Sequence, residues 1–343
     1  MLEAANMGLY EKTANGRSTL GGIYLHAEHV GSRRVVTRER EGAAWRDTPG
    51  WRFFRQILRV ALYLRERAVV RKGDCIITLS RLRTERLVAE WAAVAQGVVV
   101  APLGPHPSDA MLSAALEQLS PRMVFVGSPD DARRVREFAG SKRAFEVIVF
   151  DDTVAGANKS SLWTTACDLG GTLDTAERAQ SMRAEMRSVK PEDAAVAYPF
   201  VSVNEGTAWP RATHANMMKM LTELWDRTPA EPGDVAYVVE SPSESGLRLA
   251  LWSLVADGIS CITIGTPGAE VSEIQEIRPN IAVLPREVGS TIKSVLHLKP
   301  SGFESTWLDP VRVLLTKSGR AEVSERDARR PRSILALDGT RIR

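Results

Sequence analysis

The chain has 343 residues, a length that favours two subdomains over a single hydrophobic core. Its composition, 44% hydrophobic and 25% charged with a net charge of +3, is typical of a soluble globular protein. Charged residues and glycines interrupt the apolar stretches, so we predict neither a membrane span nor a signal peptide. The three cysteines are widely spaced, which predicts unpaired thiols and a cytoplasmic location.

Helical and strand-like segments alternate over the first half of the chain. Residues 1–18 lack any period and predict a flexible N-terminus. Apolar side chains recur at helical steps in 48–67. Strands are then predicted at 75–79, 98–101, 122–126 and 146–150, with helices near 84–97, 109–119 and 130–139. Thr84 is the expected N-cap of the first of these helices, and Gly97 its end.

A second alternating series follows a connection at 151–190, in which only a short helix near 174–187 is predicted. The predicted strands are 194–198, 234–239, 259–264, 280–284 and 311–316, and the predicted helices are 216–227, 246–258, one ending near 277 and one ending near 297. Such alternation predicts doubly wound α/β structure. We therefore expect a first α/β lobe at 19–190, a second at 191–330 and a basic tail at 331–343.

The stretch "AYPFVSVNEGTAWPRATHAN" (197–216) lies between a predicted strand and a predicted helix, where α/β enzymes often bind phosphate. Glycines let successive backbone N–H groups converge on an anion in such loops, while hydroxyl and lysine side chains add donors and charge. This stretch has one glycine. The groups that could still contact a nucleotide belong to Ser202, Gly206, Thr207, Arg211, Thr213 and His214.

The two ends of this stretch, "PEDAAVAY" and "THAN", resemble the borders of the phosphate loop in the adenylate-forming, AMP-binding superfamily. In that family Tyr-Thr-Ser-Gly-Thr-Thr-Gly-x-Pro-Lys-Gly runs into Thr-His-x-Asn. "GDCIITLS", "EPGDVAYVV", "LWSLVADGISCITIG" and "EIRPNIAVLPREVGSTI" are similar to other family segments in the same order. The resemblance covers nearly the whole chain and is strongest to long-chain fatty acyl-CoA synthetases. It implies two doubly wound α/β lobes like the N-terminal domain of those enzymes, without their C-terminal domain.

The departures from the family pattern concern its chemistry. Residues 199–204 replace the Thr-Ser-Gly-Thr-Thr-Gly run, and Pro199 lacks a backbone donor. The Lys position falls on Ala208 or, in another register, on Arg211. The acid-bearing Tyr-Gly-x-Thr-Glu motif and the catalytic Lys, both expected beyond about residue 330, are not found. We therefore expect a truncated, degenerate pseudoenzyme with no catalytic residue and no cofactor, acting as a binding or scaffold module. Its expected partner is a related synthetase, a carrier protein or a second copy.

Two alternatives remain open at this point. One is an active long-chain fatty acid ligase that uses ATP, Mg²⁺ and CoA, with a divergent loop and C-terminal parts supplied by another chain. The other is a sensor of acyl chains. No metal site is expected at His26 and His29, because further ligands are missing nearby, and no nucleic-acid partner is expected from the terminal arginines alone. His214 is expected to cap and pack rather than act as a base.

Overall fold

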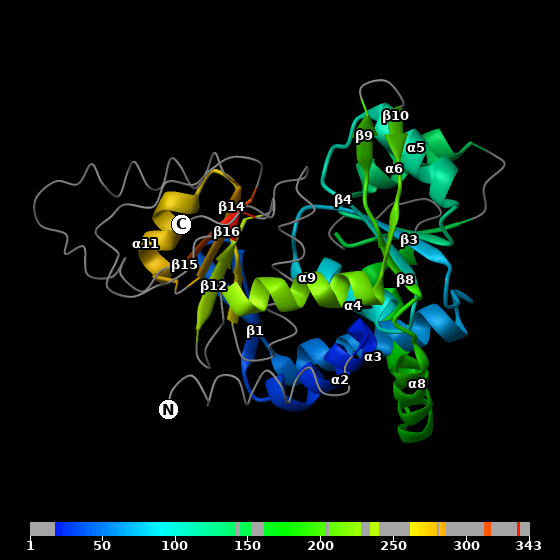
Figure 1. Cartoon of the computed structure of the whole chain (residues 1–343), viewed down its shortest axis with the longest axis horizontal. Coiled ribbons are helices and arrows are strands. Elements are labelled where there is room, and N and C mark those ends of the chain that lie inside the picture. The colour runs from blue at the N-terminus through cyan, green and yellow to red at the C-terminus, as the bar shows by residue number, and fades with distance from the viewer. Residues whose placement is uncertain are drawn as a thin grey trace, which may run out of the picture. The chain divides into compact units, whose positions relative to one another are not determined.

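The computed structural model describes residues 18–140, 145–151, 161–202, 206–227, 234–239, 261–279, 281–285, 312–316 and 335–336. The chain divides into two compact units, and each contains one seven-stranded sheet (Figure 1). The first unit comprises Met1–His29 and Phe53–Lys219, and the second comprises Val30–Arg52 and Met220–Arg343.

The sheet of the first unit has the order β11-β8-β4-β3-β5-β6-β7. Its strands are β3 (Cys75–Leu79), β4 (Val99–Leu103), β5 (Met123–Val126), β6 (Glu146–Val149), β7 (Ser161–Leu162), β8 (Ala194–Ala197) and β11 (Arg211–Thr213). All neighbours are parallel except β11, which is antiparallel to β8. The helices are α4 (Thr84–Val94), α5 (Asp109–Leu119), α6 (Pro129–Ala139), α7 (Trp163–Leu173) and α8 (Ala176–Ser188), while α2 (Leu20–Gly31), α3 (Gly50–Glu66) and α9 (His214–Arg227) run across the division between the units.

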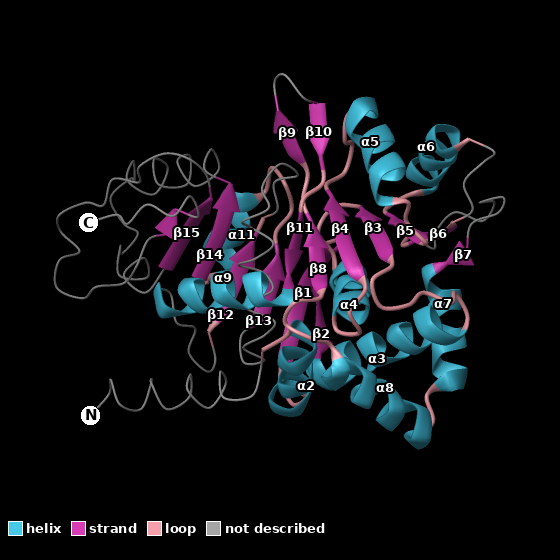
Figure 2. Cartoon of the chain, turned by 45° about the vertical axis from the view of Figure 1, so that its right-hand side comes forward, coloured by secondary structure: helices cyan, strands magenta, loops and turns pink. Residues whose placement is uncertain are grey.

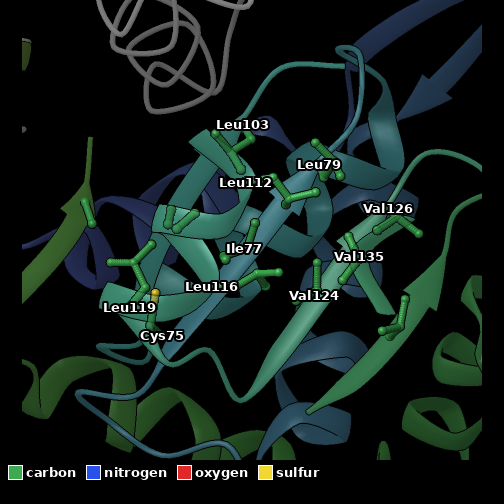
Figure 3. Packing of buried hydrophobic residues seen from close by; sticks show 14 of the residues in the cluster. Cys75, Ile77, Leu79, Leu103, Leu112, Leu116, Leu119, Val124, Val126 and Val135 are labelled. Carbon is green, nitrogen blue, oxygen red and sulfur yellow. The ribbon is translucent and has the colours of Figure 1, made fainter. Parts of the chain in front are cut away.

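Helices cover both faces of this sheet. On one face the alternate residues Cys75, Ile77 and Leu79 of β3 pack with Leu112 and Leu116 of α5 (Figure 3). On the other face the Thr78 hydroxyl donates a 2.7 Å hydrogen bond to Glu90 of α4. Strands that are buried on both faces read as nearly continuous apolar runs, which is why the sequence pattern was clear here.

The sheet of the second unit has the order β16-β15-β14-β12-β13-β1-β2 (Figure 2). Its strands are β1 (Val35–Glu41), β2 (Ala44–Pro49), β12 (Val235–Val238), β13 (Cys261–Ile264), β14 (Ile281–Pro285), β15 (Arg312–Thr316) and β16 (Leu335–Ala336). Only the β1–β2 pair is antiparallel. Tyr237, Val239 and Ala282 pack against Ile274 of α11 (Glu270–Ile277), and these residues form a hydrophobic cluster within the described part of the unit.

The predicted α/β class is confirmed, and most predicted elements occur within a few residues of their expected bounds. The Thr84 N-cap is wrong: Thr84 is the first helical residue, and Arg83 precedes it without a side-chain cap. Helix α7 and the β1–β2 hairpin were not predicted. The helices predicted at 246–258 and near 297, the N-terminal residues 1–17 and most of the basic tail lie outside the described residues.

The division between the units differs from the sequence boundary near residue 190. Strand β8 pairs with β4 through Val100 and Val196, so residues 191–219 are held in the first unit. Strand β1 pairs with β13, as Thr37 opposite Ile262 shows, so residues 30–52 are held in the second. Pairing between strands distant in the sequence sets this division, and local patterns do not report such pairing.

Candidate functional site

Residues 194–202 and 206–213 form a two-stranded antiparallel ribbon at one edge of the sheet of the first unit. Strands β8 and β11 form its base, and the Tyr198 N–H donates to the Pro210 carbonyl at 3.2 Å. The ribbon then continues into β9 (Phe200–Ser202) and β10 (Gly206–Ala208). In Figure 1 these two strands rise together beside α5. This ribbon is the segment in which the resemblance places the phosphate loop.

The backbone of the ribbon is engaged in pairing across its two strands. Gly206 lies opposite Ser202, Thr207 opposite Val201, and Ala208 opposite Phe200. A ladder of this kind directs N–H groups sideways to the neighbouring strand, whereas an anion site needs several N–H groups that converge on one point. The described part of the ribbon therefore has the backbone of a β-hairpin.

Two side chains fix the second strand of the ribbon to the body of the unit. The Trp209 side chain is only 7% exposed and belongs to the same apolar cluster as the α5 leucines. Gln118, the penultimate residue of α5, donates a 2.7 Å hydrogen bond from its side chain to the Thr207 carbonyl. In the register that puts the family lysine at Ala208, this large buried indole stands at the position of the glycine that follows it.

The Thr-His-x-Asn segment serves to begin α9. The Asn216 N–H donates to the Thr213 hydroxyl at 3.1 Å, and that hydroxyl donates to Asn216 Oδ1 at 2.9 Å. The Thr213 N–H donates to the same Oδ1 at 3.1 Å. These reciprocal bonds satisfy backbone and side-chain groups at the helix start, as a cap does.

His214 is completely buried at this helix start. The ring Nδ1 of His214 accepts a 3.2 Å hydrogen bond from the Leu20 N–H. The backbone N–H of His214 donates to the Asp193 carbonyl at 2.9 Å. Burial lowers the pKa of His214 to about 4, against the opposing effect of Asp193 and with a smaller contribution from Lys72. The ring is therefore neutral at physiological pH and, with no exposed surface, is placed to pack rather than to contact a ligand.

The six candidate nucleotide-binding residues thus divide into groups. Ser202, Gly206 and Thr207 lie in the β9–β10 hairpin, and Arg211 is an exposed residue in β11. Thr213 and His214 are committed to the start of α9. Gln118 and Trp209, which determine how the ribbon is held, were not singled out as site residues, because their contacts come from segments distant in the sequence.

Metal-ligand geometry does not occur in the described ranges. No group of three or more His, Cys, Asp or Glu side chains there could hold an ion, and His26 and His29 lie on α2 without such a group.

Burial raises the pKa of the Cys75 thiol to about 12 and that of Cys261 to about 11, so neither is a ready nucleophile. None of the helices in the described ranges is long and apolar enough to cross a membrane.

Comparison with known families confirms the resemblance to the adenylate-forming enzymes. Residues 40–199 match the family described as AMP-binding enzyme. The match begins in β1 and ends at Pro199, one residue before β9, so it stops where the ribbon departs from the phosphate-loop pattern. A search of curated protein sequences found no match.

Solved structures of adenylate-forming enzymes share the fold of this chain. The luciferase-like enzyme of the nonluminescent mealworm Zophobas morio has a TM-score of 0.70 at 14% identity, over 88% of this chain and 66% of that one. A protein assigned as a long-chain-fatty-acid CoA ligase in Rhodopseudomonas palustris has a TM-score of 0.68 at 14% identity, over 87% and 69%. The fatty acyl-adenylate ligase of L. pneumophila, solved with acyl adenylate and pyrophosphate, has a TM-score of 0.64 at 11% identity, over 88% and 50%.

The chain therefore has the α/β fold of the N-terminal domain of adenylate-forming enzymes, a group that includes fatty acid ligases. It spans half the length of the L. pneumophila ligase. At such identities the similarity establishes the fold, and activity has to be argued from the residues of this chain.

Proposed function

We propose that this protein is a non-catalytic relative of the acyl-adenylate-forming ligases and acts as a binding or scaffold module in fatty-acyl metabolism. The observation that carries the proposal is the ribbon at 194–202 and 206–213, in which Trp209 is buried in the core and β9 and β10 pair with each other. The end of the family match at Pro199 supports the same interpretation.

Adenylation requires that the charge on ATP and on the transferred group be neutralised by positioned cations and N–H donors. In this ribbon Pro199 offers no N–H, and β10 is held by Gln118 at the Thr207 carbonyl. A phosphate bound by the N–H groups of β9 and β10 would compete with the pairing of these two strands. The scaffold is kept while the groups that would hold phosphate are replaced, so we assign a binding role to the protein.

One observation favours the alternative of an active fatty acid ligase. Arg211 is exposed on β11, and in the described ranges it forms no ion pair. Its guanidinium could supply the positive charge that the family takes from lysine. In this alternative ATP, Mg²⁺ and CoA are substrates and cofactor, and another chain supplies further catalytic parts.

The test is nucleotide binding and turnover by the purified protein. We expect millimolar ATP with Mg²⁺ to leave the thermal unfolding midpoint unchanged, because a ligand stabilises only the state it binds. We also expect no release of pyrophosphate with a panel of fatty acids. An intact fatty acyl-adenylate ligase run in parallel is the positive control.

A shift with ATP, or release of pyrophosphate, would contradict the non-catalytic proposal. Arg211→Ala then tests whether Arg211 contacts the nucleotide. Loss of the thermal shift in this variant, but not in the matched Arg178→Ala variant on α8, would establish Arg211 as a phosphate ligand. A shift with fatty acid or acyl-CoA in the absence of any ATP effect would instead identify an acyl-chain sensor. Binding to a purified related synthetase or to an acyl carrier protein, measured by calorimetry, is the result expected of a scaffold.

A further inference from the structure

The start of α3 forms a fixed corner with the turn that precedes β1. The Gly50 N–H donates to the Arg34 carbonyl at 2.6 Å, and the Trp51 N–H donates to the Ser32 carbonyl at 2.8 Å. A Cβ added to Gly50 would lie 2.0 Å from the Gly31 carbonyl oxygen, so this approach of the two backbones requires glycine. These hydrogen bonds and this close approach therefore hold the backbone that carries the side chains of the corner.

Trp51 is exposed at this corner. Its side chain is 62% exposed, the largest fraction among the large hydrophobic residues that are described. Three other aromatic residues of α3, at 53, 54 and 63, are at most 3% exposed. A tryptophan left in water on a helix whose other aromatic residues are buried is a candidate contact for a partner, since exposed indole gains free energy when it is covered.

Both segments of this corner carry exposed arginines. Arg33 and Arg34 lie in the turn, and Arg52 follows Trp51. The first turn of α3 contains no acidic residue, although a helix start disfavours cations and favours anions. In the parts of the chain that are described, Arg33 and Arg52 form no ion pair, while nearby Asp47 is already paired with Arg38 at 2.6 Å. The charges of Arg33 and Arg52 are therefore not neutralised by an ion pair within the described residues.

We propose that this corner patch, made of Arg33, Arg34, Trp51 and Arg52, binds the anionic surface of a lipid bilayer. An indole inserts at the level of the lipid headgroups, where its apolar ring and its N–H are both satisfied. Arginines beside it attract anionic lipids over a Debye length. One exposed aromatic residue with exposed arginines on both segments of the corner matches this chemistry better than it matches nucleic acid, which would need an extended basic stripe. The inference does not depend on the proposed function above.

The experiment is sedimentation of the full chain with vesicles. One set contains phosphatidylcholine alone, and the other contains phosphatidylcholine with phosphatidylglycerol. We expect binding to the anionic vesicles only, with loss of binding at high salt. The double variant Arg33→Glu/Arg52→Glu should lower the partition coefficient at least about tenfold, and Trp51→Ala should lower it several-fold with less change in salt dependence.

The matched control is Arg178→Glu/Arg187→Glu, which makes the same charge change at two exposed positions of α8. It should bind anionic vesicles almost as the unaltered protein does. Circular dichroism and thermal unfolding show whether each variant is folded, and Trp51→Phe, which keeps an aromatic ring, should recover part of the binding.

Three results would overturn the proposal. The first is an equal loss of vesicle binding in the corner and α8 variants. The second is binding to duplex DNA that is stronger than binding to anionic vesicles and is lost in the corner variant. The third is a dimer in solution that Trp51→Ala converts to monomer. The second would assign the patch to nucleic acid and the third to a second copy of the chain.

Discussion

A neutral imidazole at the start of α9 joins two distant segments of the first unit. His214 accepts from Leu20 at the start of α2 and donates through its backbone to Asp193 in the turn before β8. Because Nδ1 is the acceptor, the ring proton lies on Nε2, which has no hydrogen-bond partner within the described residues. Protonation of Nδ1 would break the bond to Leu20 and place a charge in a buried site.

We therefore expect His214 to make the protein less stable in mild acid. The unfolded chain takes up a proton near pH 6.5, while the folded chain takes it up only near 4. Between these values the unfolded state binds more protons, so the free energy of unfolding falls as the pH is lowered, by about 3 kcal/mol in all. His214→Asn keeps an acceptor and cannot titrate, so urea unfolding across this range should show a flatter profile.

The exposed His29 offers the control for that measurement. His29→Asn makes the same exchange of residue type at an exposed position and controls for the substitution itself. The lowered pKa values of Asp47, Asp174 and Asp193 add a further loss of stability at lower pH, and this loss should persist in both variants. Equal slopes for His214→Asn and the unaltered protein would show that the buried ring does not titrate as expected.

At the scale of single elements, the contact of α7 with α3 depends on one glycine. A Cβ on Gly170 would lie 2.2 Å from the Arg59 carbonyl oxygen, which is backbone and cannot rotate away. A Cβ on the adjacent Gly171 would have only the Arg59 side chain nearby, at 3.7 Å. The two positions are neighbours in one helix and differ in what they contact.

Gly170→Ala should lower the free energy of unfolding by about 2 kcal/mol or more, because α7 must move away from α3. Gly171→Ala should be neutral or should raise it by up to about 0.5 kcal/mol, since alanine favours helix more than glycine does. Urea unfolding monitored by circular dichroism measures both. If the two variants are equally destabilised, helix propensity or the unfolded state, and not close packing, sets the effect.

Helix α7, compared with β3 and α5, illustrates what the sequence could and could not predict. Strand β3 and helix α5 occur at the predicted residues, because apolar runs and helical periods are local signals. Helix α7 contains two glycines and lacks such a signal, and it is stabilised by packing that includes the Gly170 contact. Strand β1 is rich in charge and pairs with β13 more than two hundred positions away, so its partner could not be found from its own pattern.

The candidate site follows the same rule. Its borders at Tyr198 and at Thr213 to Asn216 were predicted, since they are local motifs, and the presence of only one glycine between them was evident from the residues themselves. The burial of Trp209 and its contact with the α5 leucines depend on the three-dimensional arrangement. Glu90 likewise interrupts an apolar run in the sequence, but in the structure it is buried and paired with Arg86 at 2.9 Å and with Thr78.

At the scale of the whole molecule, each unit has a sheet and a hydrophobic cluster of its own. A Cβ on Gly265 would lie 2.5 Å from the Tyr237 ring, whose hydroxyl donates to the buried Glu273 at 2.9 Å. Substitutions to alanine at Gly265 and at Gly170 are therefore expected to disturb different hydrophobic clusters.

Hydrogen exchange should resolve these two disturbances by region. Gly265→Ala is expected to speed amide exchange in β12 and β13 while β5 and β6 stay protected, and Gly170→Ala should do the reverse, because separate cores open as separate cooperative units. Peptide-level mass spectrometry measures this directly. Faster exchange in both sheets of either variant would mean that the two units open together.

The placement of β1 between β2 and β13 also sets an order of events during synthesis. The β1–β2 hairpin leaves the ribosome roughly 200 residues before β13 is made, which at about 5–20 residues per second is a delay of roughly 10–40 s. During that time β1 has an unpaired edge, and such edges invite association with other chains. The charged side chains at Arg38, Glu39 and Arg40 lie along this strand, and charge on an edge strand discourages such association while the nascent chain waits for its partner.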